Sequence, residues 1–230
     1  MTLLFEIAWI LLIIALACDL ERWIDDSMIW PELSQTVSAI AWQTIALPLG
    51  MVVTLMAFRG APQDFLLSKS SDYEGAAAVT YSGALVASFV MNMLTMEFYR
   101  DNALMVTHHI VSMLAVAVVE SFDMDWYGVY SMISLLLKAG SVAYNAYLLF
   151  PTKRSMLLAY AVLMTTSNAF ALAISIWFVF NTATHAAAAW VVLAVTLGLG
   201  IGRQVFCINL YRTTPQVALP VVSRPRKGQC

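Results

Sequence analysis

Charged side chains are scarce in this chain: Asp, Glu, Lys and Arg make up 11% of its 230 residues. A soluble domain has about 25%. At the same time 61% of the residues are hydrophobic, which favours a polytopic membrane protein over a soluble globule. The formal net charge is −2, and no basic surface interleaved with aromatic residues is evident, so nucleic acid is excluded as an expected partner.

Cysteine is also rare, with only Cys18, Cys207 and Cys230 in the chain. No C-x-x-C or other metal-ligand spacing occurs, so we predict neither a disulfide framework nor a metal site. Cys18 and Cys207 fall at or within apolar segments, where a cysteine acts as a small hydrophobe. No cofactor is expected on these grounds.

A basic region is missing from the start of the chain, which a cleaved signal peptide requires. The first basic residue is Arg22, after an apolar run at Thr2–Cys18 that carries Glu6. We therefore expect this run to be a retained first membrane span.

Long apolar runs are abundant, and a membrane-crossing helix needs about 20 mostly apolar residues. Seven stretches qualify: Thr2–Cys18, Thr36–Phe58, Gly75–Leu94, Ala103–Glu120, Trp126–Phe150, Ser155–Phe180 and Ala186–Tyr211. They predict an all-α transmembrane bundle or barrel of about seven spans in one domain, residues 1–212. Residues 213–230 form a short basic tail. Pro48 should kink the second span.

The connections between the spans differ in basic residues, which face the cytosol by the positive-inside rule. One side of the predicted bundle holds Arg59 and Lys69. The other holds Arg22, Arg100, Lys153, Arg154, Arg212, Arg224, Arg226 and Lys227. This imbalance predicts an external or lumenal amino terminus and a cytosolic carboxyl terminus.

Two adjacent histidines, His108 and His109, stand inside the fourth apolar run. Ionisable groups are costly at membrane depth, and histidine suits proton transfer and nucleophilic attack near neutral pH. We interpret the pair as candidate catalytic residues, one facing the bundle interior and the other a neighbouring helix. Ser112 lies one turn further and within reach of either. The alternative is an interhelical hydrogen bond.

Asp101 stands where an N-cap of this fourth helix belongs, and we predict that structural role for it. It precedes His108 by seven residues, about 10.5 Å along the axis, and is too far away to touch it. A partner for the histidines must then come from another helix. Arg203, at a similar depth in the last span, is a candidate for holding a carboxylate or phosphate. The alternative is that Arg203 snorkels to the interface.

Polar side chains recur along one face of the fifth span in steps of three and four: Tyr127, Ser131, Ser134, Lys138, Ser141 and Asn145. Packing through small polar residues explains the serines, but an ammonium near mid-bilayer needs a partner or water. We expect a polar cavity in which Lys138 contacts carbonyls, water or a lipid headgroup, or is partly deprotonated. The predicted lipid- or substrate-binding residues are Ser112, Ser134, Lys138, Ser141, Asn145 and Arg203.

The histidine segment has the pattern Asp101-x-x-x-Met105-x-x-His108-His109-Ile110-Val111-Ser112. This pattern resembles the signature of the TLC-domain family, which includes the ceramide synthases. The resemblance implies a membrane-embedded helical bundle or barrel, an endoplasmic-reticulum or related endomembrane location, and lipid handling. In the ceramide synthases the histidine pair is implicated in acyl transfer, so acyl-CoA is an implied substrate and His108 and His109 the implied catalytic residues.

One stretch departs from the ceramide synthases, which carry a second acidic run after the histidine pair. Here the stretch Tyr130–Leu135 has no acid, and Lys138 stands about where those enzymes place a glutamate. The same family contains regulators of membrane lipid composition.

Three functions therefore stay open. The leading one is a membrane protein that binds or remodels a lipid, by histidine-dependent acyl transfer or hydrolysis if it is an enzyme. The second is a non-enzymatic lipid sensor, transporter or regulator. The third and weakest is a retinal-type photoreceptor linked through Lys138. The expected partner is a membrane or acyl lipid, and association into homo- or hetero-oligomers is left open.

Overall fold

The computed structural model describes residues 12, 15, 16, 31–73, 80–95, 103–121, 125–182 and 186–214. Most of the predicted first span, the predicted cap Asp101 and the predicted tail beyond residue 214 lie outside these ranges. The side chain of His108 is likewise outside the description, although its backbone belongs to a helix.

Helices make up nearly all of the described chain. In chain order they are α2 (Pro31–Ala41), the π-helical η1 (Trp42–Ala46), α3 (Leu47–Ala57), the 3-10 turns η2 (Pro62–Leu67) and η3 (Ser70–Asp72), α4 (Thr80–Thr95), α6 (Ala103–Ser121), α7 (Tyr127–Leu149), α8 (Arg154–Asn181) and α9 (Ala186–Thr213). Within the described ranges the extended pairing is limited to an isolated bridge between Phe58 and Tyr73. The predicted all-helical class is confirmed there.

Four helical segments are long and apolar enough to cross a membrane: Thr36–Ala57, Tyr127–Leu149, Arg154–Asn181 and Ala187–Thr213. They coincide, within a few residues at each end, with the second, fifth, sixth and seventh predicted spans. Shorter apolar helical stretches, Thr80–Val90 and His109–Val119, lie where the third and fourth spans are predicted. The chain is thus a helical membrane protein, and the full number of spans stays a prediction.

The helix that runs from α2 into α3 is distorted directly before Pro48. Proline has no N–H, and in an unbroken α-helix its ring would clash with the carbonyl four residues earlier. The five residues of η1 form a π-helical turn at this point, and Pro48 occupies the first turn of α3. The predicted kink therefore takes the form of a widened turn, and this turn buries Gln43.

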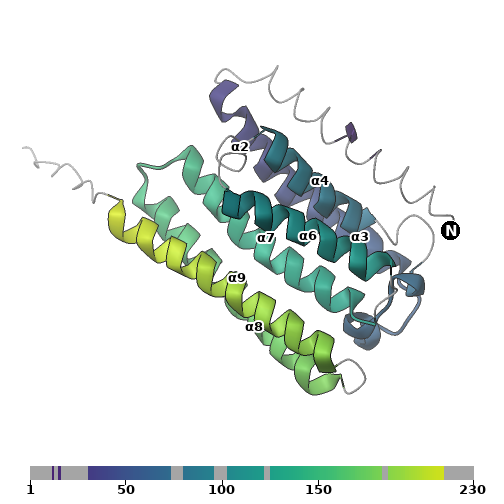
Figure 1. Ribbon diagram of the computed structural model, residues 1–230. Helices are drawn as coiled ribbons and strands as arrows, with labels where there is room; N and C mark the ends of the chain where they lie inside the picture. Colours follow the sequence, from purple (N-terminus) through teal and green to yellow (C-terminus); the bar gives the residue numbers. More distant parts are fainter. Residues whose placement is uncertain are drawn as a thin grey trace, which may run out of the picture.

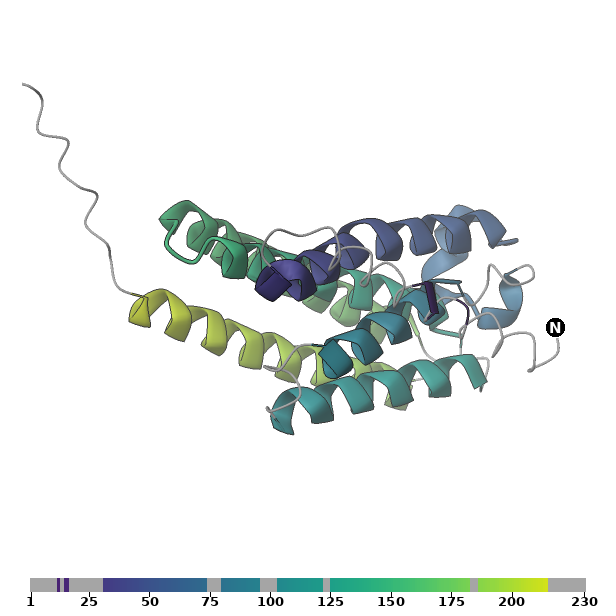
Figure 2. The same cartoon turned by 90° about the horizontal axis from the view of Figure 1, so that it is seen from above.

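α7 is the helix around which the bundle is arranged. It packs against α8 and α2 and also contacts η1, η2, α3 and α6, while α9 packs on α8 and α4 packs on α3 and α6. The axes of the long helices are roughly aligned, and α9 lies at an edge of the bundle (Figure 1, Figure 2). In Figure 1 the α7–α8 connection and the end of α9 lie at one end, with η2 and η3 at the other.

The first turn of α7 is anchored on the segment 58–73. The backbone N–H of Tyr127 donates to the carbonyl oxygen of Ser68 at 3.0 Å. The ammonium of Lys69 pairs with the carboxylate of Asp125 at 2.9 Å. The rings of Tyr73 and Tyr127 meet edge to face with centroids 5.1 Å apart. These contacts fix where α7, and the polar stripe on it, begins.

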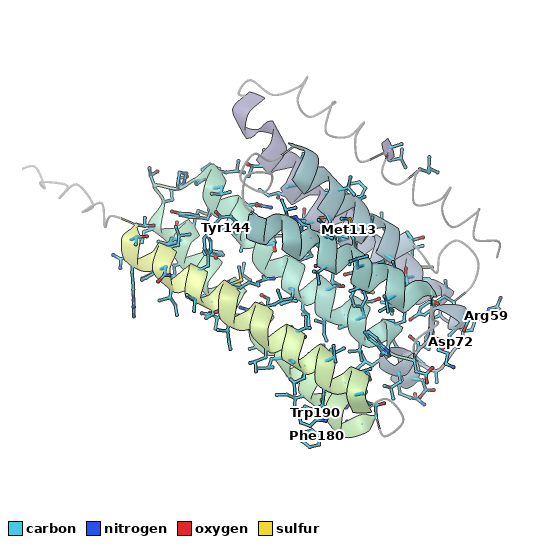
Figure 3. All side chains as sticks on the ribbon, in the orientation of Figure 1. Arg59, Asp72, Met113, Tyr144, Phe180 and Trp190 are labelled. Carbon is cyan, nitrogen blue, oxygen red and sulfur yellow. The ribbon has the colours of Figure 1, made fainter. Side chains whose placement is uncertain are left out.

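The outer face of the bundle is apolar, as a lipid-facing surface requires. Phe180 at the end of α8 is 83% exposed and Trp190 near the start of α9 is 60% exposed. Figure 3 shows both side chains projecting from the same edge of the bundle. Tryptophan is typical of helix ends that meet the membrane–water interface.

Candidate functional site

The polar stripe of α7 turns into the bundle, as its spacing predicts. Tyr127, Ser131, Lys138 and Asn145 are buried, and Ser134 and Ser141 are half-buried. Most of these side chains hydrogen-bond to neighbouring helices. Packing between helices accounts for those whose polar groups are paired in this way.

Two stripe hydroxyls bond side chains of α4. The hydroxyls of Tyr127 and Ser82 are 3.2 Å apart, and those of Ser134 and Tyr81 are 2.8 Å apart. Ser134 also donates to the carbonyl oxygen of Ser131 at 2.9 Å. These bonds satisfy the hydroxyls of Tyr127 and Ser134, whereas the buried hydroxyl of Ser131 has no hydrogen-bond partner among the described residues. The packing alternative therefore accounts for Ser134, one of the predicted lipid-binding residues.

At the far end of the stripe, Asn145 pairs with a residue that the sequence analysis missed. Its amide Nδ2 donates to Oε1 of Gln43 at 3.3 Å, and both side chains are buried. Within the described part of the chain, Nε2 of Gln43 and Oδ1 of Asn145 are buried without a hydrogen-bond partner. A glutamine inside an apolar span was the available sequence signal. The π-helical turn that carries it inward could not be read from the sequence.

Lys138 differs from the rest of the stripe because it is a buried cation. Only 8% of the residue is exposed. Its Nζ donates to Oγ of Ser88 at 3.2 Å and lies 4.0 Å from the centroid of the Phe89 ring. Among the described side chains no carboxylate pairs with it. A hydroxyl and a ring face compensate an ammonium weakly, so packing explains Lys138 poorly.

His109 is buried beside the same phenylalanine, with 3% of the residue exposed. Its ring centroid is 5.0 Å from that of Phe89, at an interplanar angle of 49°. Phe89 of α4 thus contacts His109 of α6 and Lys138 of α7. We call His109, Phe89 and Lys138 the Phe89 cluster. It agrees with the prediction that one histidine faces the bundle interior.

Arg203 of α9 reaches the turn of α7 that carries Lys138. Its Nη2 donates to the carbonyl oxygen of Leu137 at 2.6 Å, and its Nε lies 3.1 Å from Sδ of Met164. A Cβ at position 140 would lie 2.5 Å from Nη2 of this arginine. Glycine at 140 therefore leaves the room that the guanidinium occupies. The guanidinium is held at the α7 backbone.

The remaining candidates lie apart from the Phe89 cluster or outside the description. Ser112 is half-buried on α6, and within the described residues no hydrogen bond joins it to His109. Asn145 is seven residues beyond Lys138, about 10.5 Å along α7. Ser141 is half-buried between them. The roles predicted for His108 and Asp101 fall on groups outside the described residues.

The polar residues in the middle of α8 bond the backbone of α8 itself and of α9. Thr165, Thr166 and Ser167 donate to carbonyls of the preceding turn, at 2.8, 2.5 and 3.0 Å. Asn168 donates to the carbonyl oxygen of Gly200 at 3.4 Å and so links α8 to α9. This group needs no ligand to explain it.

The described side chains contain no group of three or more His, Cys, Asp or Glu that could hold a metal ion. No protein-family model, curated protein or solved structure matches the chain. The resemblance to the TLC-domain family thus stays an expectation from the histidine segment, and function must be argued from the Phe89 cluster and Arg203.

Proposed function

We propose that this chain is a seven-span protein of the endoplasmic reticulum or a related endomembrane that binds or remodels a lipid beside the Phe89 cluster. The observation that supports the proposal is the contact of one buried ring, Phe89, with both His109 and Lys138. The two ionisable residues come from different helices and are far apart in sequence. A lysine near the middle of a membrane helix costs about 3 kcal/mol, so a residue kept there without a described carboxylate is a candidate for function.

The proposed orientation has the amino terminus outside and the carboxyl terminus in the cytosol. The exposed basic residues Lys153, Arg154 and Arg212 belong to the α7–α8 connection and the end of α9. These segments lie at one end of the bundle in Figure 1. At the opposite end, where Figure 3 labels Arg59 and Asp72, basic and acidic side chains are mixed. The positive-inside rule favours the basic end as the cytosolic one.

In the enzymatic form of the proposal, a histidine of the pair acts on an acyl carbonyl. As nucleophile, the imidazole nitrogen bonds to the carbonyl carbon of an ester or thioester. The bond to the leaving alcohol or thiol breaks, and the leaving group takes up the proton that the imidazole loses. Water or an acceptor then attacks the acyl-imidazole, takes the acyl group and releases the histidine. As general base, the imidazole instead takes the proton of the attacking water or acceptor. The resemblance to the TLC-domain family favours acyl-CoA as donor.

The test is acyl turnover by the detergent-purified protein, with radiolabelled oleoyl-CoA as the probe. We expect hydrolysis or transfer of the oleoyl group in the wild type and its loss in His108→Ala and His109→Ala. The chain has three histidines, and His185→Ala is the matched control that should keep full turnover. Turnover that survives in both variants of the pair would refute the catalytic form.

A second candidate is a non-enzymatic lipid sensor, transporter or regulator. The observation that favours it is the absence of an acid from Tyr130–Leu135. This form predicts saturable binding of about one lipid per chain without turnover. Saturable binding by a preparation that shows no oleoyl turnover would select it over the enzyme.

A further inference from the structure

Two cations from different helices meet at one level of the bundle. Lys138 is buried at the middle of α7, and Arg203 of α9 bonds the carbonyl oxygen of the adjacent residue, Leu137. The two charges are close enough to interact electrostatically. Like charges repel more strongly in a low-dielectric interior than in water, so this arrangement is unfavourable by itself.

The groups that surround Lys138 do not offset its charge. Its hydrogen bond goes to the neutral hydroxyl of Ser88, and its other close contact is the face of the Phe89 ring. An ammonium carries three N–H donors, and one described hydrogen bond uses one of them. The acids whose side chains the structure describes, Asp64, Asp72 and Asp125, belong to η2, η3 and the turn before α7, at one end of the bundle and away from the middle of α7.

An anionic group would complete this arrangement. Carboxylate and phosphate oxygens accept charge-assisted hydrogen bonds from ammonium and guanidinium groups, and such bonds are about twice as strong as neutral ones. Arginine in particular suits these anions because its planar donors match their oxygens. A neutral headgroup would leave the repulsion between the two cations in place.

We infer that Lys138 and Arg203 together bind the anionic headgroup of a lipid, a carboxylate or a phosphate. The inference rests on the proposed lipid function and names the class of lipid. It places the headgroup on the α9 side of Lys138, while Phe89 and His109 lie on the α4 and α6 side. The chain selects for negative charge on the lipid, and Lys138 is the residue that senses it.

The experiment measures equilibrium binding of radiolabelled probes to the full-length protein in nanodiscs of zwitterionic lipid. The probes are oleate, oleoyl lysophosphatidate and, as the neutral counterpart, methyl oleate. We expect the two anionic probes to bind at least about tenfold more tightly than methyl oleate, because a charged hydrogen bond contributes more than a neutral one. This comparison uses the wild type and so does not depend on any variant folding.

The variant for the same assay is Lys138→Met, which keeps the length of the side chain and removes its charge. We expect at least about tenfold weaker binding of oleate, with methyl oleate unchanged. The matched control is Lys153→Met, because the ammonium of Lys153 also lies over a phenylalanine ring, that of Phe150 at 4.8 Å, but is exposed at the bundle end. Arg203→Gln serves as a second variant on the other cation.

Each outcome decides between the readings. The inference is supported if the protein prefers both anionic probes and loses this preference in Lys138→Met but not in Lys153→Met. A preference for one anionic probe alone identifies whether the headgroup is a carboxylate or a phosphate. Equal binding of oleate and methyl oleate, or equal loss in both lysine variants, overturns the inference but leaves lipid binding intact. Failure of all three probes to bind overturns the inference and the proposed function together.

Discussion

Replacing Gly128 with alanine tests how α7 is placed on the segment before it. An added Cβ at this position would overlap the backbone carbonyl oxygen of Phe65 and lie 2.8 Å from its carbonyl carbon and 3.0 Å from Cα of Leu66. All three are backbone atoms, so no side-chain rotation relieves the overlap. The helix must move away from η2 or the segment 58–73 must shift.

The expected magnitude follows from two opposing effects. Forcing an extra methyl group into a packed site costs up to about 3 kcal/mol when the neighbours are rigid. Alanine in place of glycine in a helix returns about 1 kcal/mol. Gly128→Ala should therefore lower the free energy of unfolding by about 2 kcal/mol, because the overlap with backbone outweighs the gain in helix propensity.

The assay is reversible unfolding in mixed micelles as sodium dodecyl sulfate is added, followed by helical circular dichroism. Gly198→Ala and Gly202→Ala are matched controls, because a Cβ on either glycine of α9 meets no atom within 4 Å. They should raise stability by about 0.5–1 kcal/mol each. If Gly128→Ala is as stable as these two variants, the close approach of α7 to η2 is wrong.

Three further predictions concern individual contacts. Gln43→Leu or Asn145→Leu alone should each lower the free energy of unfolding by about 1–3 kcal/mol, because a buried amide is left without its partner. The double variant should lose less than the sum of the two single variants. Additive losses in the same unfolding assay would contradict this. Gly140→Ala should displace the guanidinium that lies 2.5 Å from the added Cβ and weaken oleate binding as Arg203→Gln does, and unchanged oleate affinity would argue against it. Asp125→Asn should change stability by less than about 1 kcal/mol, because the ion pair with Lys69 is solvent-exposed, and a larger loss at high salt would be inconsistent with that reasoning.

Much of the helical layout follows from the sequence because its signals are local. Runs of apolar residues of membrane-crossing length gave the helices at 36–57, 127–149, 154–181 and 187–213 to within a few residues. The polar steps of three and four on α7 likewise predicted one inward face, since a helix repeats every 3.6 residues. Residues 74–79 lie outside the described structure, so α4 covers only part of the third predicted span, whereas α6 (Ala103–Ser121) covers the whole of the fourth.

The sequence predicts only some of the residues of the candidate site. His109 and Lys138 stand out because ionisable groups are rare in apolar runs. Their common neighbour Phe89 is one of 11 phenylalanines, and nothing in its sequence surroundings distinguishes it. The partners Ser88 and Gln43 depend on how helices pack and on the π-helical turn at Trp42–Ala46, which are tertiary effects. Pairing between helices cannot be deduced from spacing within one of them.

The most direct test of lipid entry beside the Phe89 cluster is photo-crosslinking with a fatty acid that carries a diazirine at mid-chain, followed by peptide mass spectrometry. The account predicts adducts on the segments 80–90, 109–119 and 127–149, which excess oleate removes, whereas adducts on outward-facing residues such as Phe180 and Trp190 persist. Adducts confined to the outward-facing residues of α8 and α9, and unaffected by oleate, would contradict it.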